Sequence, residues 1–303
     1  MAGTATSSFG ASRRENHDAS DFYSRFTAPL ISKSTDVVPA VQRDSIFVKE
    51  AAEMTDDEVA DNSVALVVTS PPYFVGKEYE NDLDAGHVPE TYLEYLEGLR
   101  DVFEACARKL EPGGRIAVNV ANLGRKPYRS LAADVISILQ DDLGLLLRGE
   151  IIWQKARGAT GSCAWGSFQS PVNPVLRDLT ERVVVASKGR FDRALNRRQR
   201  AKQGLPSEVS ISRDDFLEAT TDVWEIPSES ATRVGHPAPF PVGLPQRLID
   251  LYTYREDLVL DPFMGSGTTA IAAVRTGRHY VGYDVDAAYA KKAEKRVADE
   301  IKR

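Results

Sequence analysis

The apolar residues of this 303-residue chain follow two patterns that alternate along most of its length. Short, continuous apolar runs, such as 63–69 and 181–187, have the length and composition of strands buried on both faces of a sheet. Segments such as 89–110 and 287–302 instead repeat apolar residues at the spacing of a helix. Strands that alternate with helices in this way predict an α/β fold with a doubly wound, mostly parallel sheet.

The remaining apolar runs complete a predicted sheet of seven strands. The other strands are expected at 45–48, 115–120, 145–154, 257–260 and 279–283, and further helices at 51–62, 128–142, 245–254 and 268–276. Two segments interrupt the alternation: 155–178 is rich in Gly, Ser and Pro, and 188–235 opens with a basic run. We expect both to be insertion loops, where binding function tends to lie.

Composition narrows the class of protein. The residues are 42% hydrophobic, ample for a large core, and the formal net charge of -6 gives no overall sign of nucleic-acid binding. Cys106, Cys163 and four scattered histidines predict neither a disulfide framework nor a metal site, and they fit a reducing, cytoplasmic compartment. No apolar run approaches the roughly 20 residues of a membrane helix. The Ser-rich, weakly patterned residues 1–40 predict a disordered arm.

A glycine loop follows the strand at 257–260 and leads into a helix. It reads Asp261-Pro262-Phe263-Met264-Gly265-Ser266-Gly267-Thr268-Thr269. Glycines permit positive φ and close backbone approach, and the N–H groups of a helix N-terminus favour an anionic group. No Lys follows the last glycine, so this is not a Walker loop, and the spacing differs from the dinucleotide fingerprint. Asp284 ends the next strand, where an acidic residue commonly binds both ribose hydroxyls. The alternative is an ordinary turn with a helix-capping Asp.

A second loop, Ser70-Pro71-Pro72-Tyr73, ends the strand at 63–69. An exocyclic amine on a base is a poor nucleophile because its lone pair is delocalised into the ring. Acceptors at its two N–H groups favour a tetrahedral nitrogen, and Ser70 Oγ and the Pro71 carbonyl are candidates, held rigidly by the prolines. Tyr73 offers a stacking face for a base removed from its duplex. The alternative is a proline turn with a packed Tyr.

At these residues the chain resembles the amino-group DNA methyltransferases that use S-adenosylmethionine. Those enzymes carry a D/N/S-P-P-Y/F catalytic motif and an FxGxG cofactor motif, which here is 263–267. The catalytic motif comes first and the cofactor motif late, an order that resembles the β group. Ser70 in first place resembles the cytosine-N4 enzymes, because adenine-N6 enzymes more often carry Asp. The resemblance implies a Rossmann-like methyltransferase fold with an inserted DNA-recognition segment.

The resemblance also assigns site residues and boundaries. It implies a catalytic half at 41–187, a target-recognition segment at 188–235 and a cofactor-binding half at 236–303. Ser70, Pro71, Pro72 and Tyr73 are the implied catalytic residues. The implied cofactor contacts are Asp261, Pro262, Phe263, Gly265, Ser266, Gly267, Thr268 and Asp284, with His236, Pro237 and Phe240 closing the methionine end. Glu50 stands near the place of an adenine-binding Asp, with a solvent-facing helix cap as the alternative.

Basic residues in the two insertions are the candidates for DNA contact, because phosphate contacts position a protein on a duplex. They are Arg190, Arg193, Arg197, Arg198, Arg200 and Lys202 in the second insertion, with Lys155, Arg157 and Trp165 beside the first. The alternative for the basic run is a solvated helix face.

These observations predict a site-specific DNA methyltransferase that flips cytosine and methylates N4 directly, with no metal. Neither cysteine lies in a Pro-Cys motif, which disfavours cytosine-C5 chemistry. The alternatives are an adenine-N6 enzyme, an RNA or protein methyltransferase, and a non-catalytic DNA-binding relative. Protein-glutamine enzymes typically carry NPPY, which Ser70 contradicts. The expected partners are double-stranded DNA, a cognate restriction endonuclease and a second copy of the chain, in a prokaryotic or phage setting at the nucleoid.

Overall fold

Eight strands form one sheet in the part of the chain that the computed structural model describes, namely residues 30–72, 91–122, 128–155, 166–176, 179–228 and 240–302. Their order across the sheet is β1-β8-β7-β2-β3-β5-β4-β6. The strands are β1 (Ser45–Val48), β2 (Val64–Thr69), β3 (Leu110–Val120), β4 (Leu146–Gln154), β5 (Thr180–Ser187), β6 (Val223–Glu225), β7 (Leu258–Asp261) and β8 (His279–Asp284). Most of the predicted arm, residues 1–29, lies outside the described residues.

The sheet has one strand more than the seven expected. The additional strand, β6, lies in the second insertion and pairs parallel to β4. Its three residues are too few to give an apolar pattern, although Trp224 at its centre is fully buried. The predicted helix at 51–62 is also wrong beyond its first turn, because only η3 (Ala51–Glu53) is helical there.

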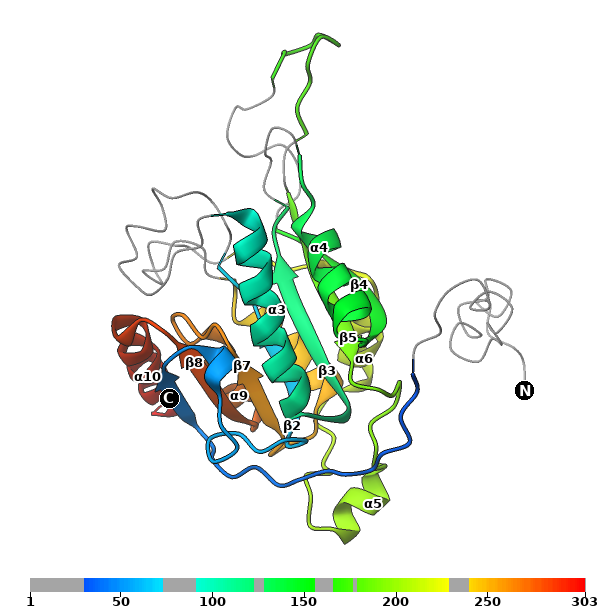
Figure 1. The fold of residues 1–303 in the computed structure, drawn as a ribbon, viewed down its shortest axis with the longest axis vertical. Helices are drawn as coiled ribbons and strands as arrows, with labels where there is room; N and C mark the ends of the chain where they lie inside the picture. The colour runs from blue at the N-terminus through cyan, green and yellow to red at the C-terminus, as the bar shows by residue number, and fades with distance from the viewer. Residues whose placement is uncertain are drawn as a thin grey trace, which may run out of the picture. The chain divides into compact units, whose positions relative to one another are not determined.

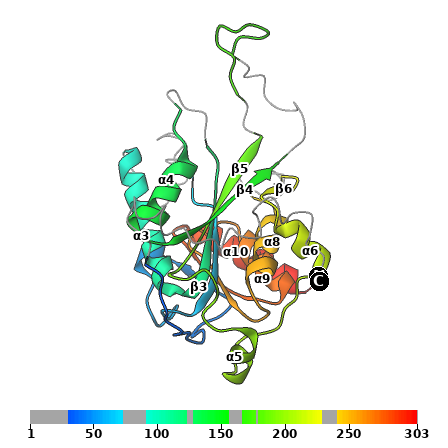
Figure 2. The ribbon, with the colours of Figure 1, turned by 90° about the vertical axis from the view of Figure 1, so that its right-hand side faces the viewer.

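Helices cover both faces of the sheet, as Figure 2 shows by viewing the layers from the side. One face carries α3 (Tyr92–Lys109) and α4 (Leu131–Ser137), the latter continuing into a π-type turn, η4 (Ile138–Asp142). The other carries α8 (Gly243–Tyr252), α9 (Thr268–Thr276) and α10 (Ala287–Ile301), with the short helix α6 (Arg213–Ala219) beside α8. The helix α3 begins with a capping box, in which Thr91 and Glu94 satisfy each other's backbone N–H groups.

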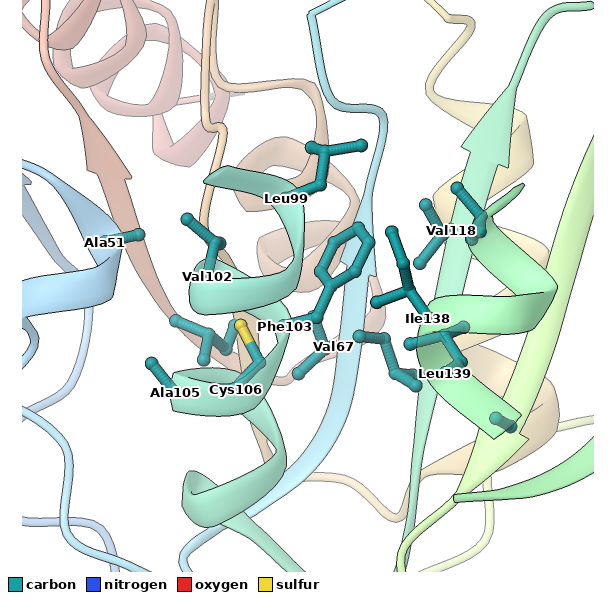
Figure 3. Packing of buried hydrophobic residues seen from close by; sticks show 14 of the residues in the cluster. Ala51, Val67, Leu99, Val102, Phe103, Ala105, Cys106, Val118, Ile138 and Leu139 are labelled. Carbon is teal, nitrogen blue, oxygen red and sulfur yellow. The ribbon is translucent and has the colours of Figure 1, made fainter. Parts of the chain in front are cut away.

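Alternation along β2 divides the core between the two faces. Val67 belongs to the cluster under α3 and α4, where Phe103 and Ile138 pack close to it (Figure 3). Leu66 and Val68 belong to the opposite cluster, with residues of α8 and α9. Every residue of β2 is buried, which explains why this strand reads as a continuous apolar run rather than an alternating one.

One strand runs against all the others. β5 is antiparallel to both of its neighbours, β3 and β4, whereas every other pairing in the sheet is parallel. We call the edge where β1–β4 and β6–β8 end the carboxyl edge, and the opposite edge the amino edge. The chain therefore leaves β5 at the amino edge, where α5 (Arg197–Lys202) lies below the start of β3 in Figure 1. It returns to the carboxyl edge through β6.

Candidate active site

The two loops singled out in the sequence leave adjacent strands at the carboxyl edge. β2 pairs in parallel with β7, so Ser70 follows Thr69 beside the point where Asp261 begins the glycine loop. Asp261 connects the loops directly: its Oδ1 accepts hydrogen bonds from Thr69 Oγ1 (2.7 Å) and Phe263 N (3.0 Å), and its Oδ2 accepts one from Thr269 Oγ1 (2.6 Å). The side chain is only 1% exposed. Asp261 therefore joins and shapes the two loops from inside the protein.

Burial controls the ionisation of Asp261. Removal from water raises its pKa to about 6, although the two threonine hydroxyls and the Phe263 N–H all favour the charged form. The nearby carboxylate of Asp284 raises the pKa further. The carboxyl group is thus less acidic than an exposed Asp, in a place where both loops depend on it.

The glycine loop has the backbone geometry expected of a ligand cradle. Gly265 and Gly267 adopt positive φ values of 51° and 83°. A Cβ at Gly267 would lie 2.8 Å from the Cβ of Ala293 in α10, so only glycine fits without displacement. Gly267 is also the N-cap of α9 and supplies no capping side chain, which leaves first-turn N–H groups of the helix to other acceptors.

Asp284 lies against this loop at the end of β8. Its Oδ2 accepts a hydrogen bond of 2.7 Å from Gly265 N, and its Oδ1 accepts one of 2.9 Å from Asp286 N. Partial burial raises its pKa above that of an exposed Asp. Lys49 N donates to the Asp284 carbonyl, which brings the exposed Glu50 to the same end of the sheet. Glu50 is the N-cap of η3 but makes no capping hydrogen bond through its side chain.

Some of the other predicted cofactor residues are packed inside the protein, and the rest lie outside the described residues. Ser266 Oγ and its carbonyl both accept from Arg296 in α10, which fixes this turn of the loop. Pro262 and Thr268 are buried, and Phe263 and Phe240 are half-buried against the two core clusters. His236 and Pro237 lie outside the described residues.

The proline loop is held by α3 and β3. Tyr95 in α3 donates a hydrogen bond of 2.9 Å to the Pro72 carbonyl, and Asn119 Nδ2 in β3 lies 3.4 Å from Ser70 Oγ. Pro71 is buried and Pro72 exposed. Tyr73 lies outside the described residues, so its stacking role stays a prediction.

Two buried polar residues beside Ser70 were missed in the sequence. Asn119 Nδ2 donates to Glu181 Oε2 at 2.6 Å, and Glu181 Oε1 lies 3.0 Å from Lys155 Nζ. Asn119 is 3% exposed and Glu181 9%. The available signal was a single Asn within the apolar run 116–120 of β3. Lys155, a predicted DNA contact, thus directs its charge at Glu181; Arg157 and Trp165 lie outside the described residues.

Two of the predicted DNA contacts, Arg193 and Arg200, lie in buried ion pairs at the amino edge. Arg193 Nε lies 2.7 Å from Glu111 Oε1, and Arg200 Nη2 lies 2.8 Å from Asp257 Oδ1. Burial alone would lower the pKa of Arg193, but the two carboxylates raise it. The cause is the reversed direction of β5, which delivers this segment to the amino edge, where β3 and β7 begin.

The rest of the basic run lies in the same region. Lys188 donates to the carbonyls of Arg108 and Leu110 at the end of α3, and Arg190 donates to the Ser34 carbonyl. Arg197, Arg198 and Lys202 are exposed on α5, and DNA contact by them stays a prediction.

A doubly wound sheet with a glycine cradle, an acidic strand end and an adjacent Ser-Pro-Pro loop defines a class, the nucleoside-cofactor-dependent transferases. Comparison with known proteins then identifies the family. Residues 64–295 match the family model described as DNA methylase, and the chain belongs to this family of amino-methyltransferases. It is a DNA amino-methyltransferase that uses S-adenosylmethionine.

Relatives and solved structures agree with this assignment. The type II methyltransferase M.MjaI of Methanocaldococcus jannaschii is 28% identical, over 82% of this chain and 89% of its own length. M.MthZI of Methanothermobacter thermautotrophicus is 29% identical, over 85% and 77%. The structure of TTHA0409 from Thermus thermophilus complexed with S-adenosyl-L-methionine has a TM-score of 0.63 at 28% identity, covering 85% of this chain and 95% of that one. The cytosine-N4-specific PvuII DNA methyltransferase shares the fold, with a TM-score of 0.62 at 19% identity over 88% and 96%.

The residues of the glycine loop fit this cofactor. Asp284 offers carboxylate oxygens for ribose hydroxyls, and the glycine N-cap of α9 provides room and N–H donors for a carboxylate. Across the described ranges, no helix has both the length and the apolar character to cross a membrane.

Proposed function

We propose that the chain is a site-specific DNA methyltransferase that modifies the N4 amine of cytosine in double-stranded DNA. The observation that carries the proposal is Ser70, a neutral hydroxyl in the first position of the catalytic motif, at the carboxyl edge beside the glycine loop. In the resemblance described above, that position holds Ser in cytosine-N4 enzymes and more often Asp in adenine-N6 enzymes.

In the proposed reaction, the main task of the protein is to position the target amine relative to the methyl donor. S-adenosylmethionine, when bound, supplies an electrophilic methyl group on a sulfonium. Ser70 Oγ and the Pro71 carbonyl accept the two N–H groups of the flipped amine, which localises its lone pair for in-line attack. The cofactor would supply its methyl group to the amine nitrogen and leave as the neutral thioether when its S–C bond breaks, and the proton lost by the amine would pass to solvent. Tyr73 stacks on the base throughout.

The proposal assigns DNA recognition to the sequence that follows β4 and β6. The described chain leaves β4 at Lys155 and β6 at Glu225, and both strands end on the same edge as Ser70. The segments that follow, 155–179 and 226–240, are therefore better candidates for base reading than α5. By analogy with the type II relatives, a cognate restriction endonuclease is the expected partner.

Nucleoside mass spectrometry of DNA from cells that express the chain tests the base assignment. N4-methylcytosine is the expected product, and N6-methyladenine in its place would overturn the choice of cytosine. Calorimetry with S-adenosylmethionine separates both outcomes from a non-catalytic relative, which would not bind it. Methylation-sensitive sequencing of DNA treated with the pure protein then gives the recognition site.

A further inference from the structure

A chain of polar side chains runs from Ser70 into the sheet. Ser70 Oγ lies 3.4 Å from Asn119 Nδ2, which lies 2.6 Å from Glu181 Oε2. The other oxygen of Glu181 lies 3.0 Å from Lys155 Nζ. The four residues come from the ends of β2, β3 and β4 and from the start of the antiparallel β5, so four strands bring them together at the carboxyl edge.

Burying these polar side chains costs free energy of folding, and packing alone does not explain why they are there. Asn119 lies in the apolar second half of β3, between the fully buried Val118 and Val120. Placing an amide and a carboxylate here stabilises the protein less than apolar side chains of similar volume would. The ion pair with Lys155 offsets the charge of Glu181 but does not explain its presence. A role in the adjacent site accounts for it.

The chemistry of the carboxylate fixes the orientation of Asn119. A carboxylate only accepts hydrogen bonds, so Glu181 requires the NH2 group of the Asn119 amide to face it. The same Nδ2 faces Ser70, and it therefore presents a donor to Oγ. One lone pair of Ser70 Oγ is directed at Asn119, and the hydroxyl proton points elsewhere. The second lone pair then has a defined direction in which to accept an amine N–H.

We propose that Glu181 is a positioning residue for methyl transfer, which acts through Asn119 to orient the hydroxyl of Ser70, while Lys155 balances its charge. The inference rests on the proposed function, because it takes Ser70 as an acceptor of the target amine. Glu181 does not touch the reacting atoms in this scheme. Its loss changes the rate of methyl transfer rather than the affinity for the cofactor, which binds at the glycine loop.

Four variants of the full-length protein test the chain of contacts in single-turnover methyl transfer to DNA. Glu181→Leu removes the acceptor and lowers the rate constant by about 30–100-fold, the loss expected when a catalytic group is misplaced by about 1 Å. Glu181→Gln keeps a neutral acceptor for Asn119 and lowers the rate by about 3–10-fold. Asn119→Ala matches Glu181→Leu. Glu150→Gln, an exposed acid on β4, is the matched control and stays within about twofold of wild type.

A double-variant cycle decides whether Glu181 acts through Asn119. The rate of Asn119→Ala with Glu181→Gln equals that of Asn119→Ala alone, because the link is already broken. The proposal would be overturned if the fold losses in rate of the two single variants multiplied in the double variant. It would also be overturned if the Glu181 variants kept the wild-type rate. A loss of rate that only followed a loss of folded protein or of S-adenosylmethionine affinity would overturn it as well. The cycle uses Glu181→Gln, so it holds even where Glu181→Leu does not fold. Wild-type protein that methylates no amino group would instead refute the proposed function.

Discussion

Arg200→Met should destabilise the protein without weakening DNA binding. The guanidinium of Arg200 lies at the amino edge and donates to Glu111 (3.1 Å), to Asp257 (2.8 Å) and to the Pro206 carbonyl (2.5 Å). The residue is 1% exposed. Methionine replaces much of the hydrocarbon volume but none of the charge, so the substitution isolates the electrostatic contribution.

The contacts of Arg193 determine the size of the effect. Breaking a buried ion pair by removing one partner typically costs about 3–5 kcal/mol. Arg193 still bonds both Glu111 and Asp257 in the variant, so neither carboxylate is left alone. We therefore expect the lower end, a loss of about 3 kcal/mol in the free energy of unfolding, or a fall of about 6–10 °C in Tm.

Urea unfolding followed by circular dichroism measures the stability, and fluorescence polarisation with labelled duplex measures DNA affinity well below the transition. Arg198→Met, an exposed neighbour on α5, is the control and should change the free energy of unfolding by less than about 0.5 kcal/mol. If Arg200→Met unfolds like wild type but binds DNA more weakly, Arg200 contacts DNA and the reasoning is wrong.

Three further changes address the glycine loop. The folded-state pKa of Asp261, about 6, exceeds its ordinary value of 3.8, so its contribution to stability is largest at low pH. As the pH rises to 6 the protein loses up to about 3 kcal/mol of this contribution. Asp261→Asn should remove this part of the pH dependence of urea unfolding, and an unchanged profile would contradict the assignment. Gly267→Ala, at a φ of 83° and facing Ala293, should lose about 1–2 kcal/mol in thermal unfolding, whereas Gly98→Ala, in open space within α3, should not destabilise. Asp284→Ala should weaken S-adenosylmethionine binding by about 10–100-fold in calorimetry and leave DNA affinity unchanged, and equal loss of both would refute its assignment to the cofactor.

Local pattern was sufficient to predict the strands that carry the two motifs. β2 is apolar throughout, and the prolines after Thr69 cannot continue a ladder, so the end of the strand was marked in the sequence. The strand leading to Asp261 was marked by the glycines that follow it. Both signals lie within a few residues of the feature that they predict.

The direction of a strand and the pairing of distant side chains could not be predicted from local sequence. Nothing in residues 180–187 distinguishes a parallel strand from an antiparallel one, yet the reversal of β5 moves the whole basic run away from Ser70. Likewise, Glu181 and Lys155 are 26 residues apart in the chain, and Asn119 and Glu181 are 62 apart. Such pairs become visible only when the order of strands in the sheet is known.

The position of β7 has a consequence for synthesis of the chain on the ribosome. β2 must pair with β7 on one side, and Thr69 precedes Asp261 by 192 residues. At about 5–20 residues per second, this edge of β2 stays unpaired for roughly 10–40 s after it has been made. During that interval an entirely apolar strand offers free backbone groups to other nascent chains. The interleaving that places the glycine loop beside Ser70 thus lengthens the time for which the growing polypeptide is exposed to such pairing.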